Sequence, residues 1–186
     1  MRKLIAAINM SLDGFCDHTA MSADSETHDH YTELIRSADT LVYGRITYLL
    51  MENFWPTLVK QPSGEQSLDE FAAAIDSVDK LVFSHTLKKL EWDNARIANG
   101  SIEEEITALK QQSGRAILVG SPSLIVSTMN LQLVDELQIC VHPVIVGKGL
   151  SLLKNISERL DLKLIKTKTF RCGAVIFYYE PIKNNH

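Results

Sequence analysis

The sequence predicts an α/β protein built on a mostly parallel β-sheet, with helices on both faces and an antiparallel edge. Strand-like apolar runs and helical patterns alternate along residues 3–133, which is typical of parallel strands joined by helices. Residues 134–180 contain strand patterns without intervening helices, and these are expected to add antiparallel strands at one edge. With 186 residues, 45% of them hydrophobic, the chain is long enough for one domain with a sizeable core.

Short apolar runs bounded by turn residues mark the strands of the alternating part. These strands are expected at 3–11, 40–44, 80–87 and 116–120. The helices are expected from about 23 to 38, at 45–51, after residue 67, after residue 101 and after residue 121. Tyr31, Leu34, Ile35 and Ala38 indicate the first helix because they share one face at helical spacing. Capping boxes of Ser67 with Glu70 and Ser101 with Glu104 mark two later helix starts.

The C-terminal part changes character. Its strands are expected at 134–147, 160–170 and 173–180. The consecutive apolar and aromatic residues of the last strand suggest burial on both faces, which the edge of a small sheet cannot supply alone. A two-fold homodimer joined near these strands is therefore expected. Residues 53–67, with two prolines and a glycine, are expected to be a loop, and the single domain is expected to span 1–182, before a disordered tail at 183–186.

Composition excludes several classes of function. The net charge of −4 gives no indication of a nucleic-acid surface, and no apolar run approaches the length that crosses a bilayer. The first apolar segment is too short for a signal peptide, so a cytoplasmic location is expected. The three cysteines lie far apart, without the paired spacing of a zinc site. No metal site is therefore expected, and the cysteines are expected to be free thiols.

One strand-to-helix turn is typical of an anion site. In "ILVGSPSLIVSTM" (117–129), Gly120 permits a backbone conformation that other residues resist, Ser121 can cap a helix, and Pro122 fits the first helical position. The resulting helix N-terminus carries unpaired N–H groups and partial positive charge, to which a phosphate can bind. An ordinary structural turn is the alternative reading of this stretch taken alone.

Three of the expected strands end in residues suited to anions. These ends are Gly44-Arg45-Ile46-Thr47, Ser84-His85-Thr86 and Gly120-Ser121. Ligands of open α/β sheets bind at the carboxyl ends of the strands, where these residues would meet. Their hydroxyls, their cation and their helix N–H groups together predict an anion-binding site.

Five segments carry a resemblance to a known family. They are "NMSLDGF", "VYGRITY", "FSHTL", "LVGSPSL" and "LVDELQICVHPVIVGKGLSLL". In their order and approximate spacing they resemble the dihydrofolate-reductase-like superfamily, in particular the reductase domain of bifunctional riboflavin-biosynthesis proteins and its stand-alone relatives. The resemblance covers nearly the whole chain. It implies a three-layer fold with a central sheet of about eight strands, NADPH as cofactor, and often a homodimer formed through the C-terminal strands.

The resemblance assigns the cofactor-binding residues. It places Gly44 and Arg45 at the cofactor phosphates, with Thr47 in the first turn of the next helix. An Arg makes paired hydrogen bonds to phosphate that a Lys cannot match, although a surface ion pair is the alternative role. Gly120 and Ser121 match the pyrophosphate-binding turn.

The resemblance also implies a contact with the 2′-phosphate of NADPH. Ser84 and Thr86 match the hydroxyls at that phosphate. His85 departs from the pattern, because relatives commonly carry Arg there. Since imidazole is mostly neutral at pH 7, preference for NADPH over NADH is expected to be weakened.

The substrate side is less clearly marked. Folate reductases use a carboxylate of the first helix to hold the pterin, and the nearest counterpart is His28, with Asp24 and Asp29 beside it. Asp24 and His28 are the catalytic candidates, although an acidic helix start without catalytic function explains them equally well. Asp13 lies by resemblance beside the nicotinamide, and a turn-forming Asp-Gly is its alternative reading. His142 is expected to be structural, whereas Trp55 fits either the substrate pocket or a loop anchor.

The sequence thus predicts an NADPH-dependent reductase of a small molecule, either 5-amino-6-(5-phosphoribosylamino)uracil or a related planar heterocycle or carbonyl compound. The zinc motifs of the riboflavin deaminase are absent from the sequence. A ribose-phosphate substrate would be expected to be bound by several basic side chains, whereas residues 10–35 are acidic and rich in histidine. The alternative is a catalytically silent nucleotide-binding regulatory protein on the same fold.

Overall fold

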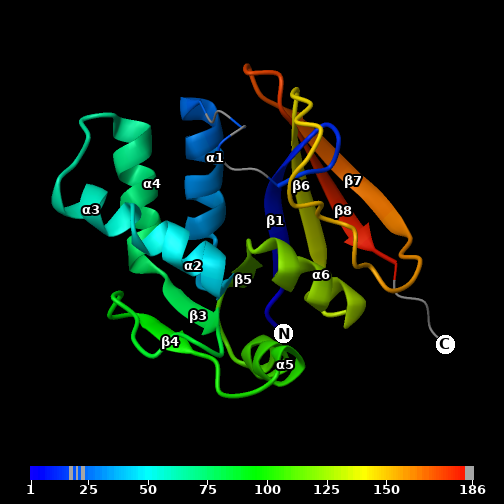
Figure 1. The fold of residues 1–186 in the computed structure, drawn as a ribbon, viewed down its shortest axis with the longest axis horizontal. Helices are drawn as coiled ribbons and strands as arrows, with labels where there is room; N and C mark the ends of the chain where they lie inside the picture. Colours follow the sequence, from blue (N-terminus) through cyan, green and yellow to red (C-terminus); the bar gives the residue numbers. More distant parts are fainter. Residues whose placement is uncertain (17–18, 20, 22–23, 183–186) are drawn as a thin grey trace.

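A central eight-stranded sheet organises the protein in a computed structural model that describes residues 1–16, 19, 21 and 24–182 (Figure 1). The strands are β1 (Leu4–Ser11), β2 (Ala38–Gly44), β3 (Asp79–Phe83), β4 (Ala95–Ile97), β5 (Ala116–Val119), β6 (Glu136–His142), β7 (Leu162–Thr169) and β8 (Val175–Pro181). The helices are α1 (Ser25–Arg36), α2 (Arg45–Glu52), α3 (Trp55–Lys60), α4 (Gln66–Ser77), α5 (Ile102–Gln111) and α6 (Pro122–Asn130).

The strand order is β4-β3-β2-β5-β1-β6-β8-β7. The first six strands in this order are parallel, and β8 and β7 complete the sheet in antiparallel pairings. The predicted mostly parallel sheet with an antiparallel C-terminal edge is therefore confirmed. Because the parallel strands run in one direction, the carboxyl ends of β1, β2, β3, β5 and β6 lie at one edge, where the predicted site residues follow them.

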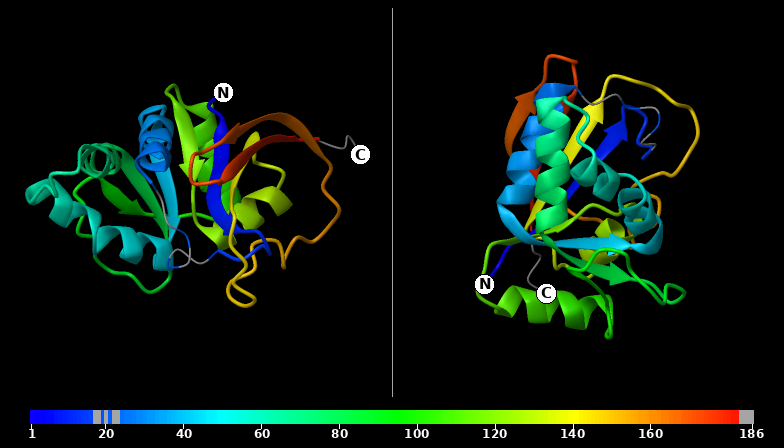
Figure 2. Two further views of the ribbon diagram at one scale, coloured as in Figure 1. Left: turned by 90° about the horizontal axis from the view of Figure 1, so that it is seen from above. Right: turned by 90° about the vertical axis from the view of Figure 1, so that its left-hand side faces the viewer.

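Helices pack on both faces of the sheet, as predicted, so that the molecule has three layers (Figure 2). One core joins the sheet to α5 and α6, through side chains such as Ile106 and Ile125 that are almost completely buried. The opposite core joins the sheet to α1, α2 and α4, through side chains such as Ile35, Tyr48 and Ile75. Apolar burial on both faces is the main driving force for this arrangement.

Several predicted boundaries are wrong. Residues 53–67 are not a continuous loop, because Pro56 occupies a first-turn position of α3. The third strand ends at Phe83 rather than at residue 87, and the strand predicted at 134–147 ends at His142. The short strand β4 was not predicted, since three residues carry too little alternation to be recognised. The tail at 183–186 lies outside the described residues.

Only one of the two predicted capping boxes forms. Ser101 accepts a hydrogen bond from the backbone N–H of Glu104, whose carboxylate accepts one from the Ser101 N–H, so this box is confirmed. Helix α4 instead has Glu65 at its N-cap position, without a side-chain cap, and the Ser67 hydroxyl donates to Glu65. The prediction of a cap at Ser67 is therefore wrong, because α4 begins one residue before it.

Candidate functional site

The two glycine-containing turns of the predicted site are joined by a hydrogen bond. The backbone N–H of Gly44, after β2, donates to the hydroxyl of Ser121, after β5, over 2.9 Å. Ser121 is only 2% exposed, and its side chain makes no capping hydrogen bond to α6. The prediction that Ser121 caps the helix is therefore wrong. Its hydroxyl instead fixes the β2–α2 turn against the β5–α6 turn.

Neither glycine is required by the backbone conformation or by contacts within the described chain. Gly120 is not among the residues with positive φ, so the predicted glycine-only conformation is wrong. A Cβ placed on Gly120 would lie 3.7 Å from the carbonyl oxygen of Ala7, which is ordinary van der Waals contact. Gly44 has a φ of −80°, and a Cβ at this position would have no heavy atom nearer than 3.8 Å. Both positions thus keep free the space that a side chain would fill.

Both turns lead into helices with open N-termini. Gly44 and Ser121 are the N-cap residues of α2 and α6, and neither helix has a side-chain cap or an acidic residue in its first turn. The first N–H groups of a helix lack partners within the helix and carry partial positive charge. Two such ends, held together by the Gly44–Ser121 bond, form an edge of the sheet suited to anionic groups.

The cation of this edge is Arg45, the first residue of α2. Its side chain is exposed, and none of the ion pairs in the described part of the chain includes it. Thr47 is half-buried two residues further along. The alternative reading of Arg45 as one half of a surface ion pair therefore has no support within the described chain.

The third strand end places hydroxyls beside Arg45. Gly44 and Phe83 are partners in the parallel pairing of β2 with β3, so Ser84 follows at the same edge. The Ser84 hydroxyl oxygen accepts from the N–H groups of Thr86 and Leu87, at 3.2 and 3.0 Å, which fixes the turn and leaves the hydroxyl proton available. His85 and Thr86 are exposed. The structure thus places the three predicted turns at one edge of the sheet, and it joins two of them directly through the Gly44–Ser121 hydrogen bond.

Asp13 is held by groups of the protein itself. Its carboxylate accepts hydrogen bonds from the Ser11 hydroxyl at 2.7 Å and from the N–H groups of Val146 and Gly147 at 3.2 and 2.7 Å. The Ser11 hydrogen bond, followed by the backbone bonds, lowers the pKa of Asp13. Asp13 therefore stays ionised at neutral pH and ties the turn after β1 to the loop after β6, which makes it a poor proton donor.

The two catalytic candidates at α1, Asp24 and His28, contact different partners. Asp24 is the N-cap of α1, and its carboxylate accepts from the Thr27 N–H at 2.8 Å and from the Thr27 hydroxyl at 2.7 Å. The hydroxyl bond is the main cause of a lowered pKa of Asp24. The His28 ring packs toward Phe71 of α4, with centroids 5.9 Å apart, and its Nδ1 is buried without a partner. Phe71 also packs on Trp55 at 4.5 Å, so Trp55 anchors α3 to α4.

Sequence reasoning missed a polar group near the same edge. Asn9 of β1 accepts a hydrogen bond from the Tyr31 hydroxyl, and the same oxygen lies 3.0 Å from Nε2 of His142. His142 is 4% exposed, and burial lowers the pKa of its ring. The sequence signal that could have indicated this polar group is Asn9 itself, a single Asn within the apolar strand "LIAAINMS". Its side chain is on a face of the strand that otherwise packs against helices.

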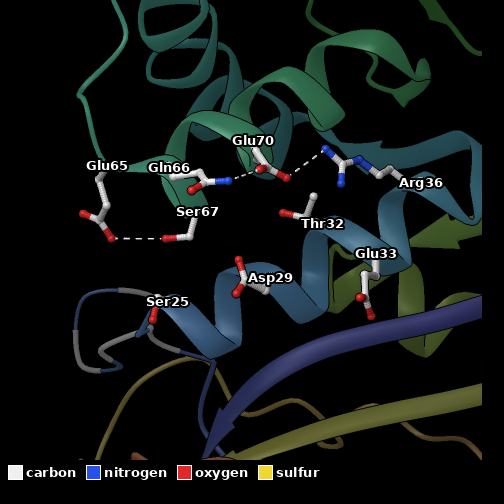
Figure 3. A pocket seen from close by; sticks show the side chains of 9 residues that line it. All are labelled: Ser25, Asp29, Thr32, Glu33, Arg36, Glu65, Gln66, Ser67 and Glu70. Carbon is white, nitrogen blue, oxygen red and sulfur yellow. Dashed lines mark hydrogen bonds and ion pairs between the residues drawn. The ribbon is translucent and has the colours of Figure 1, made fainter.

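A separate pocket lies between α1 and the start of α4 (Figure 3). It is lined by Ser25, Asp29, Thr32, Glu33, Arg36, Glu65, Gln66, Ser67 and Glu70. Arg36, the one cation of this lining, is paired with Glu70 at 3.2 Å. The four carboxylates of the lining disfavour a phosphate, so this pocket is distinct from the predicted cofactor site.

The described residues provide neither a metal site nor a membrane span. No group of three or more His, Cys, Asp or Glu side chains in the part that the structure describes is arranged to hold a metal ion. Within the same part, none of the helices combines the length and the apolar character needed to cross a membrane.

The fold and the strand-end turns define a class of protein, namely three-layer α/β proteins with open helix N-termini at the carboxyl edge of the sheet. The chain belongs to the RibD C-terminal domain family, whose model matches residues 2–176. It is 31% identical to the uncharacterized protein YyaP of Bacillus subtilis (strain 168) over 182 residues, which cover 96% of this chain and 94% of that protein. The family resemblance inferred from the sequence is thereby confirmed.

Solved structures share the fold. A putative riboflavin biosynthesis protein from Shewanella sp. PV-4 superposes with a TM-score of 0.73 at 19% identity, covering 97% of this chain and 99% of that chain. Dihydrofolate reductase from Enterococcus faecalis, solved in complex with NADP(H), gives a TM-score of 0.61 at 13% identity and covers 97% of each chain. The fold is thus dihydrofolate-reductase-like, as predicted.

Proposed function

We propose that the protein is an NADPH-dependent reductase of a small planar heterocycle or a related carbonyl compound, similar to 5-amino-6-(5-phosphoribosylamino)uracil reductases. Membership of the RibD C-terminal domain family supports a reductase in general. The likeness to a dihydrofolate reductase that binds NADP(H) supports the cofactor. The expected cytoplasmic location is part of the same proposal.

The observation that carries the proposal is the pair of joined turns at Gly44 and Ser121. Two uncapped helix starts face one edge, and both glycines leave room that the described chain does not fill. Glycine in such turns permits close approach of a pyrophosphate to backbone N–H groups. These residues would hold the central phosphates, with Arg45 binding a phosphate through its guanidinium.

The adenosine end of the cofactor is assigned to the turn after β3. The Ser84 hydroxyl proton and the exposed side chains of His85 and Thr86 would face the 2′-phosphate. An imidazole lacks the permanent charge and the paired N–H donors of an arginine, so the preference for NADPH over NADH is proposed to be modest.

When bound, NADPH supplies a hydride to a C=N or C=O bond, and the adjoining heteroatom needs a proton. Asp13 and Asp24 are unsuited to donate this proton, because the hydrogen bonds they accept lower the pKa of each carboxyl. Their contribution is structural: Asp13 holds the turn after β1, and Asp24 holds the start of α1.

Substitution of Arg45 tests the cofactor assignment. Arg45→Ala should weaken NADPH binding by about 1.5 to 3 kcal/mol through the loss of charge-assisted hydrogen bonds, without loss of the fold. Isothermal titration calorimetry measures the affinity. Arg159→Ala is the matched control, since Arg159 is exposed and already paired with Asp161. Equal NADPH affinity of Arg45→Ala and the parent would remove Arg45 from the site.

A second candidate is a nucleotide-binding protein without turnover. It is favoured by the first helix, where His28 packs toward Phe71 and Asp24 serves as the N-cap. Oxidation of NADPH with pterin, pyrimidine and quinone compounds, followed by absorbance, separates the two functions. Turnover of any of these compounds supports the reductase, and tight binding of NADPH without oxidation supports the second candidate.

A further inference from the structure

The polar group at Asn9 connects three elements on the face of the sheet covered by α1. Asn9 of β1 is the register partner of Cys140 of β6, and Tyr31 reaches both from α1. The Tyr31 hydroxyl donates to Oδ1 of Asn9 over 2.9 Å. Nε2 of His142, at the end of β6, lies 3.0 Å from the same oxygen.

Both neighbours of this oxygen act as donors at neutral pH. Burial raises the pKa of Tyr31 well above its ordinary value, so the hydroxyl keeps its proton. Burial lowers the pKa of His142, so the ring is neutral. Because an amide oxygen can only accept, a hydrogen bond between it and Nε2 requires the ring proton on Nε2, which also lies 3.6 Å from the sulfur of Cys140. A carbonyl oxygen has two lone pairs, and these two donors occupy them. The carboxamide of Asn9 is thereby fixed in one orientation.

The amide nitrogen of Asn9 points away from these donors and is left without a partner. No acceptor in the described chain takes a hydrogen bond from its Nδ2. Asn9 is half-buried, and its Nδ2 is not among the fully buried side-chain atoms without partners in the described chain, so this nitrogen retains some accessible surface. An accessible donor group held by two hydrogen bonds is pre-organised to bind an acceptor.

Asn9 also lies close to the proposed cofactor edge. Gly120 approaches β1 at Ala7, whose carbonyl oxygen would lie 3.7 Å from a Cβ on Gly120. Asn9 is two residues further toward the carboxyl end of the same strand and shares the face of Ala7, because side chains alternate along a strand. Its amide group is therefore near the edge where substrate and cofactor would meet.

We propose that Asn9 is a substrate-binding residue, whose amide N–H groups donate to a carbonyl or ring-nitrogen acceptor of a planar substrate. Tyr31 and His142 are positioning residues, which act by holding the carboxamide of Asn9. This assignment rests on the reductase function proposed above and narrows its substrate class. The site favours rings that present acceptors, such as a pyrimidinedione or a pteridinedione, over rings that present amino groups at the same position.

An isosteric substitution tests the direction of this hydrogen bond. Asn9→Asp keeps an oxygen acceptor for Tyr31 and His142 but replaces the donor group with a second acceptor. The probes are lumazine (pteridine-2,4-dione) and 2,4-diaminopteridine. Lumazine carries carbonyl groups at the two ring positions where 2,4-diaminopteridine carries amino groups. Dissociation constants are measured by fluorescence titration, with and without saturating NADPH.

The parent protein should bind lumazine more tightly than 2,4-diaminopteridine, and Asn9→Asp should reverse this preference. The ratio of the two dissociation constants should change by about tenfold to a hundredfold, since a polar site discriminates strongly against a mismatched partner. A structural role for Asn9 would change both affinities together. An unchanged ratio in Asn9→Asp, or a parent protein that binds neither pteridine at millimolar concentration, overturns the proposal.

A second variant tests the positioning role. Tyr31→Phe removes one of the two donors to Asn9 and should reduce the preference for lumazine several-fold. Tyr48→Phe is the matched control, because it removes a buried tyrosine hydroxyl whose partner is Glu52 of α2. An equal loss of preference in both variants contradicts a specific role of Tyr31.

Different results contradict the proposed reductase function and the proposed role of Asn9. A parent protein that does not bind NADPH contradicts the reductase, while the reversal of preference measured without NADPH still tests Asn9. A parent protein that binds NADPH, combined with an unchanged ratio in Asn9→Asp, contradicts the assignment of Asn9 alone.

Discussion

At the scale of single residues, Ser121 joins the turns that contribute most to the proposed cofactor site. Its hydroxyl accepts from the Gly44 N–H instead of capping its own helix. The sequence "GSP" predicts a serine cap, and the contact that replaces it comes from a residue 77 positions away in the chain. Local spacing carries no information about such a partner, so the bridging role could not be predicted.

Ser121→Ala tests this bridging role. The half-buried Gly44 N–H would lose its partner, so the free energy of unfolding should fall by about 0.5 to 1.5 kcal/mol. NADPH affinity per folded molecule should fall as well, because the two turns are no longer held together. Urea denaturation and calorimetry measure the two quantities.

Ser127→Ala is the control for Ser121→Ala. It makes the same substitution within α6, at a half-buried serine that donates to the Ser123 carbonyl. It should leave NADPH affinity unchanged. Loss of stability in Ser121→Ala with parental NADPH affinity would limit the hydroxyl to a structural role.

We predict that His30 makes the stability of the fold dependent on pH. Its ring packs on Tyr31, Phe170 and Tyr178, and burial, with smaller effects from Lys168 and Lys166, lowers its pKa from 6.5 to about 4. Between these values the unfolded chain binds a proton that the folded chain does not. The free energy of unfolding should therefore decrease as the pH falls from 6.5 toward 4.

His30→Phe should flatten this dependence, as measured by urea denaturation at several pH values. His85→Gln, which replaces an exposed histidine, is measured beside it as the control for the loss of a histidine. If the free energy of unfolding changes with pH equally in the parent and in His30→Phe, His30 is not the cause of the pH dependence.

At the scale of elements, the predictable features are those encoded by local periodicity. The alternation of apolar runs and the face shared by Tyr31, Leu34 and Ile35 predict β1 to β3, β5 and α1, which the structure contains. The short elements α3 and β4 were missed because they depend on tertiary contacts. Trp55 of α3 packs on Phe71, and β4 pairs with β3 without an apolar pattern of its own.

The candidate site likewise contains some residues that local sequence patterns predict and others that only the folded chain brings together. Gly44, Arg45, Ser84 and Ser121 could be predicted to lie near one another because strand ends in a parallel sheet converge on one edge. Asn9 was missed because its partners come from α1 and β6, and only the folded chain brings them together. The sequence thus predicts where a ligand edge lies better than which side chains face the ligand.

The two Ser-x-x-Glu motifs provide an element-scale prediction. Ser101→Ala should lower the free energy of unfolding by about 0.5 to 2 kcal/mol, because it removes a formed cap of α5. Ser67→Ala should cost less, since Ser67 lies two residues after the α4 N-cap and its hydroxyl donates to Glu65 over 3.3 Å instead of capping the helix. Thermal and urea denaturation of both variants measure the difference. Equal destabilisation would contradict the distinction between the two helix starts.

At the scale of the whole molecule, β7 is the free edge of the antiparallel part, next to β8. Strand β8 is therefore not an edge strand. Ile176 and Tyr178 of β8 are buried, whereas the residues next to them in the strand are half-buried. This alternation differs from the predicted burial on both faces. Leu164 and Ile165 of β7 are each 51% exposed. An edge strand with exposed apolar side chains favours association with a second chain.

We therefore predict a two-fold homodimer formed through β7 and β8. Light scattering at micromolar concentration should give the mass of a dimer, and Leu164→Lys should shift the protein toward the monomer. Leu131→Lys is the control, since Leu131 is 39% exposed but follows α6, outside this edge. A monomer mass for the parent protein would rule out the dimer.

The central place of β1 has a consequence for biosynthesis. Of the strands of this sheet, β1 is synthesised first, yet its partners in the sheet are β5 and β6, as Leu4 pairs with Ile117 and Ile8 with Ile139. One edge of this apolar strand therefore lacks its partner until synthesis has passed residue 119, and the other edge until synthesis has passed residue 142. Such long sequence separation gives slow folding and exposes the nascent chain to aggregation. A chain arrested before β5 should therefore depend on chaperones to stay in solution.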